Sequence, residues 1–213
     1  MATRKRRSAD EARAEILEVA ERRLAEHGLE GLNVVDVARE AGMSHATLIH
    51  HFGNTEDMRR ALINRMTNRL LRDVIDVLQA EQTLNVEVLM RDLFEALSRG
   101  GHAKLLAWMA VGEKSLSQSV QPSSEVYELF AELIPVLARH LPVRESAEQA
   151  ARRLVYLVAT SAIGYGVSGA TLANVVGLDA EDEAGFPEWL GAQVRTLLQA
   201  RTLLQTRTLR TGK

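Results

Sequence analysis

Cysteine is absent from the 213-residue chain, and aromatic residues make up only 4% of it. The absence of thiols excludes disulfides, cysteine nucleophiles and cysteine-ligated zinc. Few aromatic residues and four prolines, set against abundant Ala, Leu, Glu and Arg, favour helix over sheet. We therefore expect an all-α protein.

Long apolar runs and an overall excess of positive charge are also lacking. No stretch approaches the roughly 18 uninterrupted apolar residues of a membrane span, so we expect a cytoplasmic chain that does not engage a membrane. The formal net charge is -2, which excludes a uniformly basic, nucleic-acid-binding surface. Positive charge is instead concentrated in the run Arg4-Lys5-Arg6-Arg7. Residues 1–9 are thus expected to form a basic disordered arm, which either contacts DNA phosphates or remains a solvated terminus.

Helical periodicity and stop signals organise the first 80 residues. Apolar residues recur at helical spacing from Asp10 to His27, and Gly28 follows where helices commonly end. A short helix is expected after the N-cap residue Asn33, then a turn at residues 42–44, then a second short helix that Gly53 ends. Two short helices across a glycine-containing turn form the core of a helix-turn-helix.

The remainder of the chain is also expected to be helical. Patterns recur over residues 55–78, 86–98, 102–117, 124–140, 146–164 and 187–206, which makes about nine helices in all. We divide the chain into the arm at 1–9, a three-helix DNA-binding domain at 10–54, and a helical ligand-binding and dimerisation domain at 55–213. Gly164, Gly166 and Gly169 spell GxGxxG, but no strand precedes them, so helix packing or termination is favoured over a dinucleotide loop.

The segment from Asp10 to Met58 resembles the DNA-binding domain of the TetR family of transcriptional regulators. The matching residues are Ile16-Leu17, Ala20, AEHG at 25–28, VAREAGMS at 37–44, Thr47-Leu48, His51-Phe52 and EDM at 56–58. The resemblance implies a homodimer through the last two helices, double-stranded DNA with a near-palindromic operator as a partner, and a small-molecule effector. A two-fold dimer presents two reading helices to successive major grooves.

The DNA-binding residues are inferred from the same resemblance. Small or polar side chains at the start of a reading helix can approach base edges and phosphates. The predicted set is Asn33, Ser44, His45, Ala46, Thr47, Ile49, His50, His51 and Thr55. The family often has Tyr in place of Ile49 and Lys in place of Thr55, both phosphate contacts, and we expect the basic arm to compensate.

The three histidines of this set could also suggest a metal site. His50 and His51 point in different directions on a helix, and no carboxylate is placed to complete a ligand set, so we expect no metal and no cofactor. Nor does a Ser/His/Asp set or a carboxylate pair stand out at catalytic spacing. An enzyme on a helical bundle is therefore the less favoured class.

The helices from residue 86 to 140 carry aromatic and Met side chains that either line an apolar pocket or form an ordinary core. The candidate ligand-binding residues are Met90, Phe94, Leu105, Trp108, Met109, Glu113, Tyr127 and Phe130. The preferred interpretation is a homodimeric repressor released from DNA by a small, largely apolar effector. Alternatives are an activator, an effector-independent regulator, or an interaction protein with a vestigial helix-turn-helix.

Overall fold

The computed structural model describes residues 8–80, 85–112, 123–141 and 146–196, and every regular element in these ranges is a helix. The elements are α1 (Ala9–His27), the 3₁₀ helix η1 (Gly28–Leu32), α2 (Val34–Glu40), α3 (His45–Phe52), α4 (Thr55–Ala80), α5 (Val86–Arg99), α6 (His102–Gly112), α7 (Ser124–His140), α8 (Ala147–Val176) and α9 (Ala180–Ala184). A further helix covers residues 186–196. The expected all-α class is confirmed.

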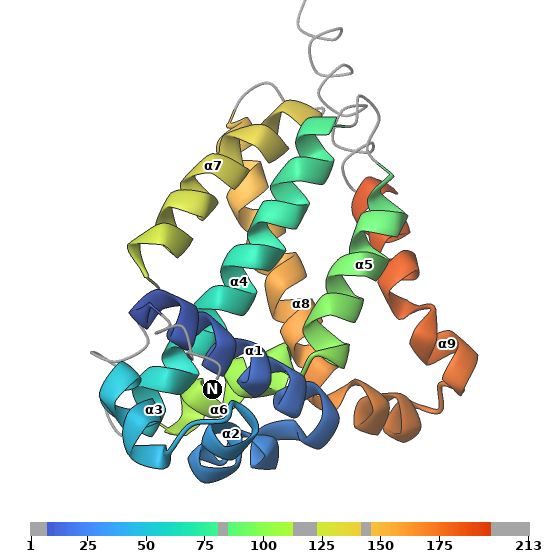
Figure 1. Ribbon diagram of the computed structural model, residues 1–213. Coiled ribbons are helices and arrows are strands. Elements are labelled where there is room, and N and C mark those ends of the chain that lie inside the picture. The colour runs from blue at the N-terminus through green and yellow to red at the C-terminus, as the bar shows by residue number, and fades with distance from the viewer. Residues whose placement is uncertain (1–7, 81–84, 113–122, 142–145, 197–213) are drawn as a thin grey trace, which may run out of the picture.

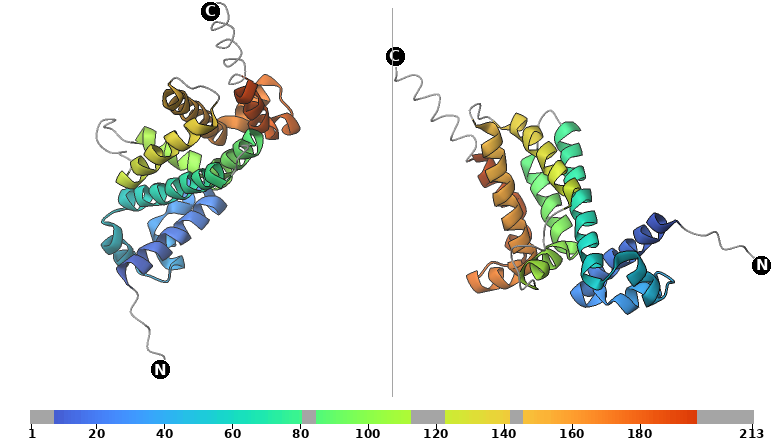
Figure 2. Two further views of the ribbon diagram at one scale, coloured as in Figure 1. Left: turned by 90° about the horizontal axis from the view of Figure 1, so that it is seen from above. Right: turned by 90° about the vertical axis from the view of Figure 1, so that its left-hand side faces the viewer.

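The helices form a small N-terminal cluster beside an upright bundle. In Figure 1, α1, α2 and α3 lie at the base, whereas α4, α5, α7 and α8 rise away from them, with α6 between the two parts. The right-hand view of Figure 2 shows the N-terminal helices projecting to one side of the bundle, next to α4. The start of α4 packs with the N-terminal cluster, so the two parts share apolar contacts at this helix. The proposed domain boundary at residue 54 stays a prediction.

Side-chain caps explain where the first helices begin. At α1 the Ser8 hydroxyl accepts a hydrogen bond from the Glu11 amide at 3.1 Å, and the Glu11 carboxylate accepts one from the Ser8 amide at 2.8 Å. Asn33 and Ser44 cap α2 and α3 by accepting from backbone amides at 2.9 and 3.1 Å. Each cap satisfies amides that lack a partner within the helix, which locates the helix start in the sequence itself.

Three apolar clusters hold the described part of the chain together. The first joins α1, η1, α2 and α3 to the start of α4 and to Leu105 and Met109 of α6. The second joins the end of α4 to α7 and α8. The third joins α5, α6 and α8, with Phe186 and Leu190 packed against it. Helix α4 therefore contributes to the core of both parts.

Helix α8 is longer than the sequence pattern indicated. We expected it to end near Gly164, but it continues to Val176 and stops at Gly177, whose φ is 77°. Packing explains the difference, since a Cβ at Gly166 would lie 2.6 Å from the Cβ of Ala103, so the glycine permits close contact with α6. By length and composition alone α8 could cross a membrane, but it packs against α5, α6 and α7.

A glycine in η1 is required by the packing of the N-terminal cluster. The Arg23 guanidinium donates to the Gly31 carbonyl at 2.9 Å and pairs with Glu40 at 3.0 Å, which joins α1, η1 and α2. A Cβ at Gly31 would lie 2.3 Å from the Arg23 carbonyl oxygen. Backbone atoms cannot move aside cheaply, so no larger residue fits here.

We predict that Gly31→Ala lowers the free energy of unfolding by about 1–3 kcal/mol, the usual range for overpacking a core. Urea denaturation followed by circular dichroism measures it. Gly100→Ala is the matched control, because its Cβ would meet its nearest neighbours at 3.5 Å, an ordinary contact distance. Equal stability of the two variants would contradict the packing argument.

Candidate nucleic-acid interface and internal cavity

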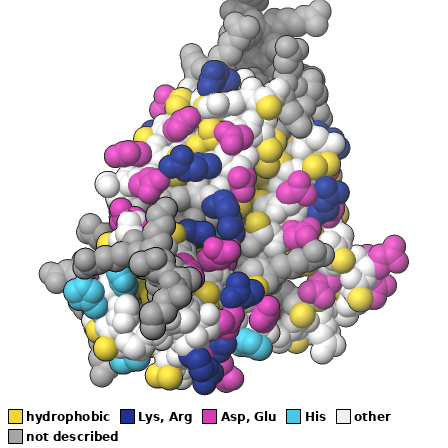
Figure 3. Space-filling view, in the orientation of Figure 1, with side chains coloured by type: hydrophobic (Ala, Val, Ile, Leu, Met, Phe, Trp, Pro, Cys, Tyr) yellow, Lys and Arg dark blue, Asp and Glu magenta, His cyan; other side chains and the backbone are white. Residues whose placement is uncertain are grey.

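Helix α3 has a buried face and an exposed face. Leu48 and Phe52 lie in the N-terminal core, with exposed fractions of 0% and 6%. Ala46 and His50 precede them by two residues, which places them about 200° around the helix, and both are exposed. Figure 3 shows histidine side chains gathered over this part of the surface.

The predicted reading residues share this exposed surface. Ser44, His45, Ala46, Thr47 and His50 are exposed, whereas Ile49 and His51 are half-buried. Ile49 packs against the N-terminal core, so part of its side chain serves the fold. The Ser44 and Thr47 hydroxyls lie 2.8 Å apart at the start of α3. The result is a polar surface of small side chains, of the type that enters a major groove.

The turn before α3 sets the angle between the two short helices. Gly42 adopts a φ of 66°, a left-handed conformation that glycine tolerates best. The Met43 amide then donates to the Ala38 carbonyl at 2.8 Å, which closes α2. The glycine-containing turn expected at residues 42–44 is present.

The junction between α3 and α4 is held from both sides. The Arg13 guanidinium of α1 donates to the His51 carbonyl and lies 4.3 Å from the centroid of the Phe52 ring. Across the junction, the Asn54 side-chain oxygen Oδ1 accepts from the Asp57 backbone amide at 2.8 Å, and the Asn54 side-chain Nδ2 donates to the Asp57 carboxylate at 2.7 Å. Thr55 is therefore the first residue of a capped helix, near the end of α3.

Several charged side chains near the helix-turn-helix already form ion pairs with a neighbour in the same helix. Arg39 pairs with Asp36, and Arg59 pairs with Glu56 at 2.9 Å. Asn33 is exposed, but its side-chain oxygen already caps α2.

The basic run at residues 4–7 lies outside the described residues. Within the described ranges, no group of three His, Asp or Glu side chains could hold a metal ion.

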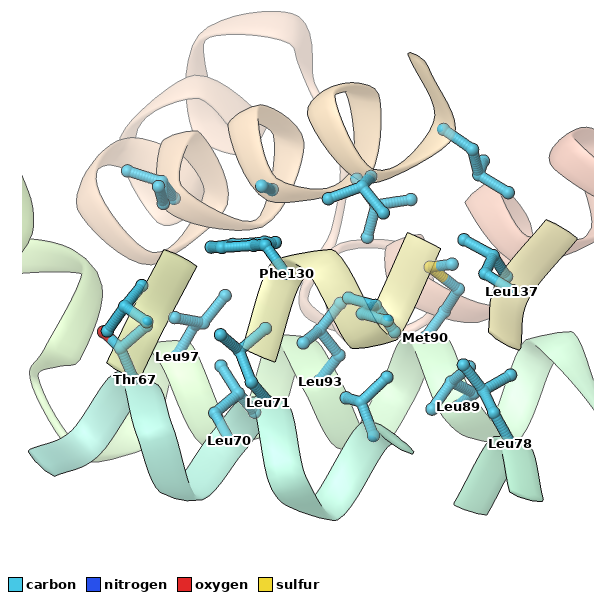
Figure 4. Close-up of a pocket in the computed structure, with 18 of the residues that line it drawn as sticks. Thr67, Leu70, Leu71, Leu78, Leu89, Met90, Leu93, Leu97, Phe130 and Leu137 are labelled. Carbon is cyan, nitrogen blue, oxygen red and sulfur yellow. The ribbon is translucent and has the colours of Figure 1, made fainter. Parts of the chain in front are cut away.

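A cavity of about 750 Å³ lies among α4, α5, α6, α7 and α8. Most of its lining residues are Leu, Val, Ile or Met, together with Phe130, and polar side chains lie toward its two ends. Figure 4 shows Thr67 at one end of the row of side chains along α4 and Leu78 with Leu137 at the other. The volume and the apolar wall are typical of a small-molecule site.

Comparison with known sequences identifies the N-terminal motif. The sequence model of the bacterial regulatory proteins of the tetR family matches residues 16–62. The helix-turn-helix segment of the chain is therefore that of the TetR family. The match covers the core of the helix-turn-helix and the first turns of α4, so the family resemblance of the sequence is confirmed.

Individual relatives extend the likeness beyond the TetR motif. The transcriptional repressor KstR2 of Mycobacterium tuberculosis is 31% identical over 109 residues, which cover 50% of this chain and 54% of the repressor. The chain thus spans about half the length of this curated relative in the alignment. Among solved structures, a Mesorhizobium loti protein assigned to the TetR family superposes with a TM-score of 0.63 at 18% identity, over 92% of this chain and 98% of that one.

A second solved structure was determined with a ligand. The regulator FadR of Bacillus subtilis in complex with stearoyl-CoA superposes with a TM-score of 0.52 at 17% identity, over 84% of this chain and 95% of FadR. At such low identity, both structural matches indicate a shared fold. The helices beyond the match to the TetR model therefore have the arrangement found in these two proteins.

The cavity brings together part of the predicted ligand-binding set. Met90, Met109 and Phe130 line it. Glu113 lies outside the described residues. The other four predicted residues do not line the cavity, because tertiary packing directs their side chains elsewhere.

Two of these four are structural and two are at the surface. The ring of Phe94 packs 5.4 Å from that of Tyr165, and Leu105 belongs to the N-terminal core. Trp108 lies at the surface, and the Arg59 guanidinium carbon is 4.4 Å from the centroid of the Trp108 ring. Tyr127 is also at the surface, with 57% of it exposed. Apolar composition alone could not separate core, cavity and surface positions on these helices.

Four polar residues at the lower end of the cavity were missed. Arg60, Asn64 and Thr67 follow one another at three- and four-residue spacing along α4, and His102 of α6 joins them. The spacing was a usable signal, because polar residues at this period fall on one helix face. His102 gave no local signal, since only the fold buries it to 3% exposure.

Burial determines the protonation of His102. Its Nε2 lies 3.0 Å from the Thr67 hydroxyl. Burial, with a smaller contribution from the positive charge of Arg69, lowers the pKa of His102 from 6.5 to about 4. The imidazole is therefore neutral in the folded protein at physiological pH.

We predict that this histidine makes the protein sensitive to acid. Between pH 6.5 and about 4 the unfolded chain binds a proton at His102 that the folded protein does not, so stability falls as pH falls. From pH 7.5 to 5 the wild type should lose about 2 kcal/mol of unfolding free energy more than His102→Gln. Urea unfolding at both pH values measures this, with the exposed His27→Gln as control. An equal loss in the wild type and His102→Gln would contradict the assignment.

Proposed function

We propose that the protein is a cytoplasmic, homodimeric transcriptional repressor that binds a near-palindromic operator through α3 and leaves it when an apolar effector fills the cavity. The observation that carries the proposal is the exposed polar face of α3, within the segment that matches the TetR family model. KstR2, which aligns with half of the chain, is a transcriptional repressor and supports the sign of regulation.

Base contacts are assigned to the exposed face of α3. His45, Thr47 and His50 offer hydrogen-bonding groups to base edges, and Ala46 allows close approach. Asn33, His51 and Thr55 lie at helix ends and are assigned to the DNA backbone. Phosphate contacts from the basic run at residues 4–7 would add affinity that falls with salt.

The effector site is assigned to the cavity along α4. An apolar wall and a volume of about 750 Å³ suit an apolar small molecule. The similar fold of FadR, solved with stearoyl-CoA, supports an effector with a long apolar part. Because α4 lines the cavity and also packs in the N-terminal core, an effector that shifts α4 changes the position of α3. A coupling of about 1–3 kcal/mol would change operator affinity roughly 5- to 150-fold.

The dimer interface is assigned to α8 and the helix at 186–196. Leu157, Gly164, Ser168 and Val175 lie on one line of α8, and Val175 is 76% exposed although it is apolar. Small residues among apolar ones permit close approach of helices, and a row of exposed apolar side chains indicates a partner surface. Val158 and Val194, by contrast, are buried within the subunit.

We predict that selection from a randomised duplex library enriches a two-fold-symmetric site. On the enriched site, His45→Ala, Thr47→Ala and His50→Ala should each weaken binding by about 1–3 kcal/mol if they contact bases. Fluorescence anisotropy at two salt concentrations measures the affinities. His27→Ala is the matched control, since this exposed histidine lies at the opposite end of α1 from the Arg13 contact to α3.

Failure to enrich any site, with residual binding that disappears as salt rises, would favour an interaction protein with a vestigial helix-turn-helix. Enrichment without any effect of the three α3 changes would place the DNA contacts elsewhere.

We predict that Leu157→Arg combined with Val175→Arg converts the dimer to monomers, because it places two charges on the proposed two-fold interface. Sedimentation velocity gives the molecular mass in solution. Val111→Arg is the control, since Val111 is an exposed valine, at 86%, on α6 and is not one of the proposed interface residues. A dimer that survives the double change would refute the α8 interface.

A further inference from the structure

The cavity has polar side chains at both ends, and one of these ends lies next to the DNA-binding part. Arg60, Asn64, Thr67 and His102 line the end formed by the first half of α4, whereas the middle is formed by side chains such as Leu93 and Phe130. From Arg60 to Leu78 the wall follows α4 for 18 residues, about 27 Å at 1.5 Å per residue. This shape suits an elongated molecule with one polar head.

Arg60 has an incompletely satisfied guanidinium at that end. Its Nε is buried and has no hydrogen-bond partner, whereas its Nη1 donates to the Asp57 carboxylate at 2.9 Å. A buried guanidinium N–H without an acceptor is costly, and an anion is the strongest acceptor that could meet it. The neighbouring Thr67 hydroxyl and neutral His102 add hydrogen-bonding capacity without negative charge.

The opposite end of the cavity offers less to an anion. Arg195 is exposed and already pairs with Glu87 at 2.7 Å. Arg139 is exposed to solvent, and the half-buried His140 already donates from Nε2 to the Leu78 carbonyl at 2.7 Å. An anionic head therefore gains more at Arg60 than at any of these residues.

Arg60 also connects the cavity to α3. Its partner Asp57 exchanges two hydrogen bonds with Asn54, the residue that caps α4 directly after α3 and Gly53. An anion that draws Arg60 toward the cavity would remove the hydrogen bond that holds the Asp57 carboxylate in place, so this carboxylate would no longer be fixed against Asn54. The cap fixes how α4 meets the reading helix.

We propose that Arg60 binds the carboxylate of an elongated amphiphilic effector, and that the carboxylate competes with Asp57 for Arg60 and thereby loosens the α3–α4 junction. The proposal rests on the effector-released repressor described above, and adds the chemical class of the effector and the residue that transmits its binding.

The test compares decanoate with decanol, which share a chain length but differ in charge. The affinity of each amphiphile is measured by its displacement of the neutral dye Nile red. The proteins compared are the wild type, Arg60→Gln, Arg60→Lys and the matched control Arg139→Gln. We expect the wild type and Arg139→Gln to bind decanoate about 10-fold or more tighter than decanol, as a charge-assisted hydrogen bond provides. Arg60→Gln should lose this preference with decanol affinity unchanged, which also shows that the variant folds, and Arg60→Lys should regain part of it.

A preference that persists in Arg60→Gln, or that disappears in Arg139→Gln, would overturn the assignment of Arg60. Absence of displacement by either amphiphile in the wild type would overturn the effector class, while DNA binding by the selection assay could still hold, so the two proposals fail separately.

The transmission step is tested on the selected duplex. We expect decanoate to lower the operator affinity of the wild type at least 5-fold, and decanol at equal dye displacement to lower it less. Release that is equal for the two amphiphiles, or that persists fully in Arg60→Gln, would overturn the competition with Asp57.

Discussion

Helix α4 is packed into two cores at once, and this constrains the rest of the molecule. Near its start Met58 and Leu62 are fully buried among α1, α2 and α3, and near its end Leu78 is buried among α7 and α8. Interiors of proteins are close-packed, so a displacement at one end is not absorbed locally. A displacement of α4 within the bundle is therefore expected to reach the N-terminal helices.

Contacts at the base strengthen this connection. Leu105 and Met109 of α6 belong to the N-terminal core, while α6 also packs against α8. Arg13 joins α1 to the end of α3, and Arg23 joins α1 to η1 and α2. The reading helix is thus carried by a rigid cluster, and its exposed face is free to be polar because Leu48 and Phe52 supply its burial.

Local rules predicted much of this architecture. Asn33 and Ser44 mark the starts of α2 and α3, and Gly42 and Gly53 end them, because caps and left-handed turns depend on residues adjacent in the sequence. The end of α8 was predicted wrongly. Gly166 reduces helix propensity locally, yet contact with Ala103, more than 60 positions earlier in the chain, outweighs that cost.

The sequence by itself determined the helical class, the capped helix-turn-helix and the polar face of α3, because backbone hydrogen bonds and helix faces depend on neighbours within a few residues. The tertiary structure decided which apolar side chains surround empty space. It placed Phe130 at the cavity, Phe94 in an aromatic cluster and Trp108 at the surface. It also buried His102 against Thr67 and turned Arg60 toward both the cavity and Asp57. These outcomes depend on the distances between helices that are remote in sequence, which periodicity does not encode.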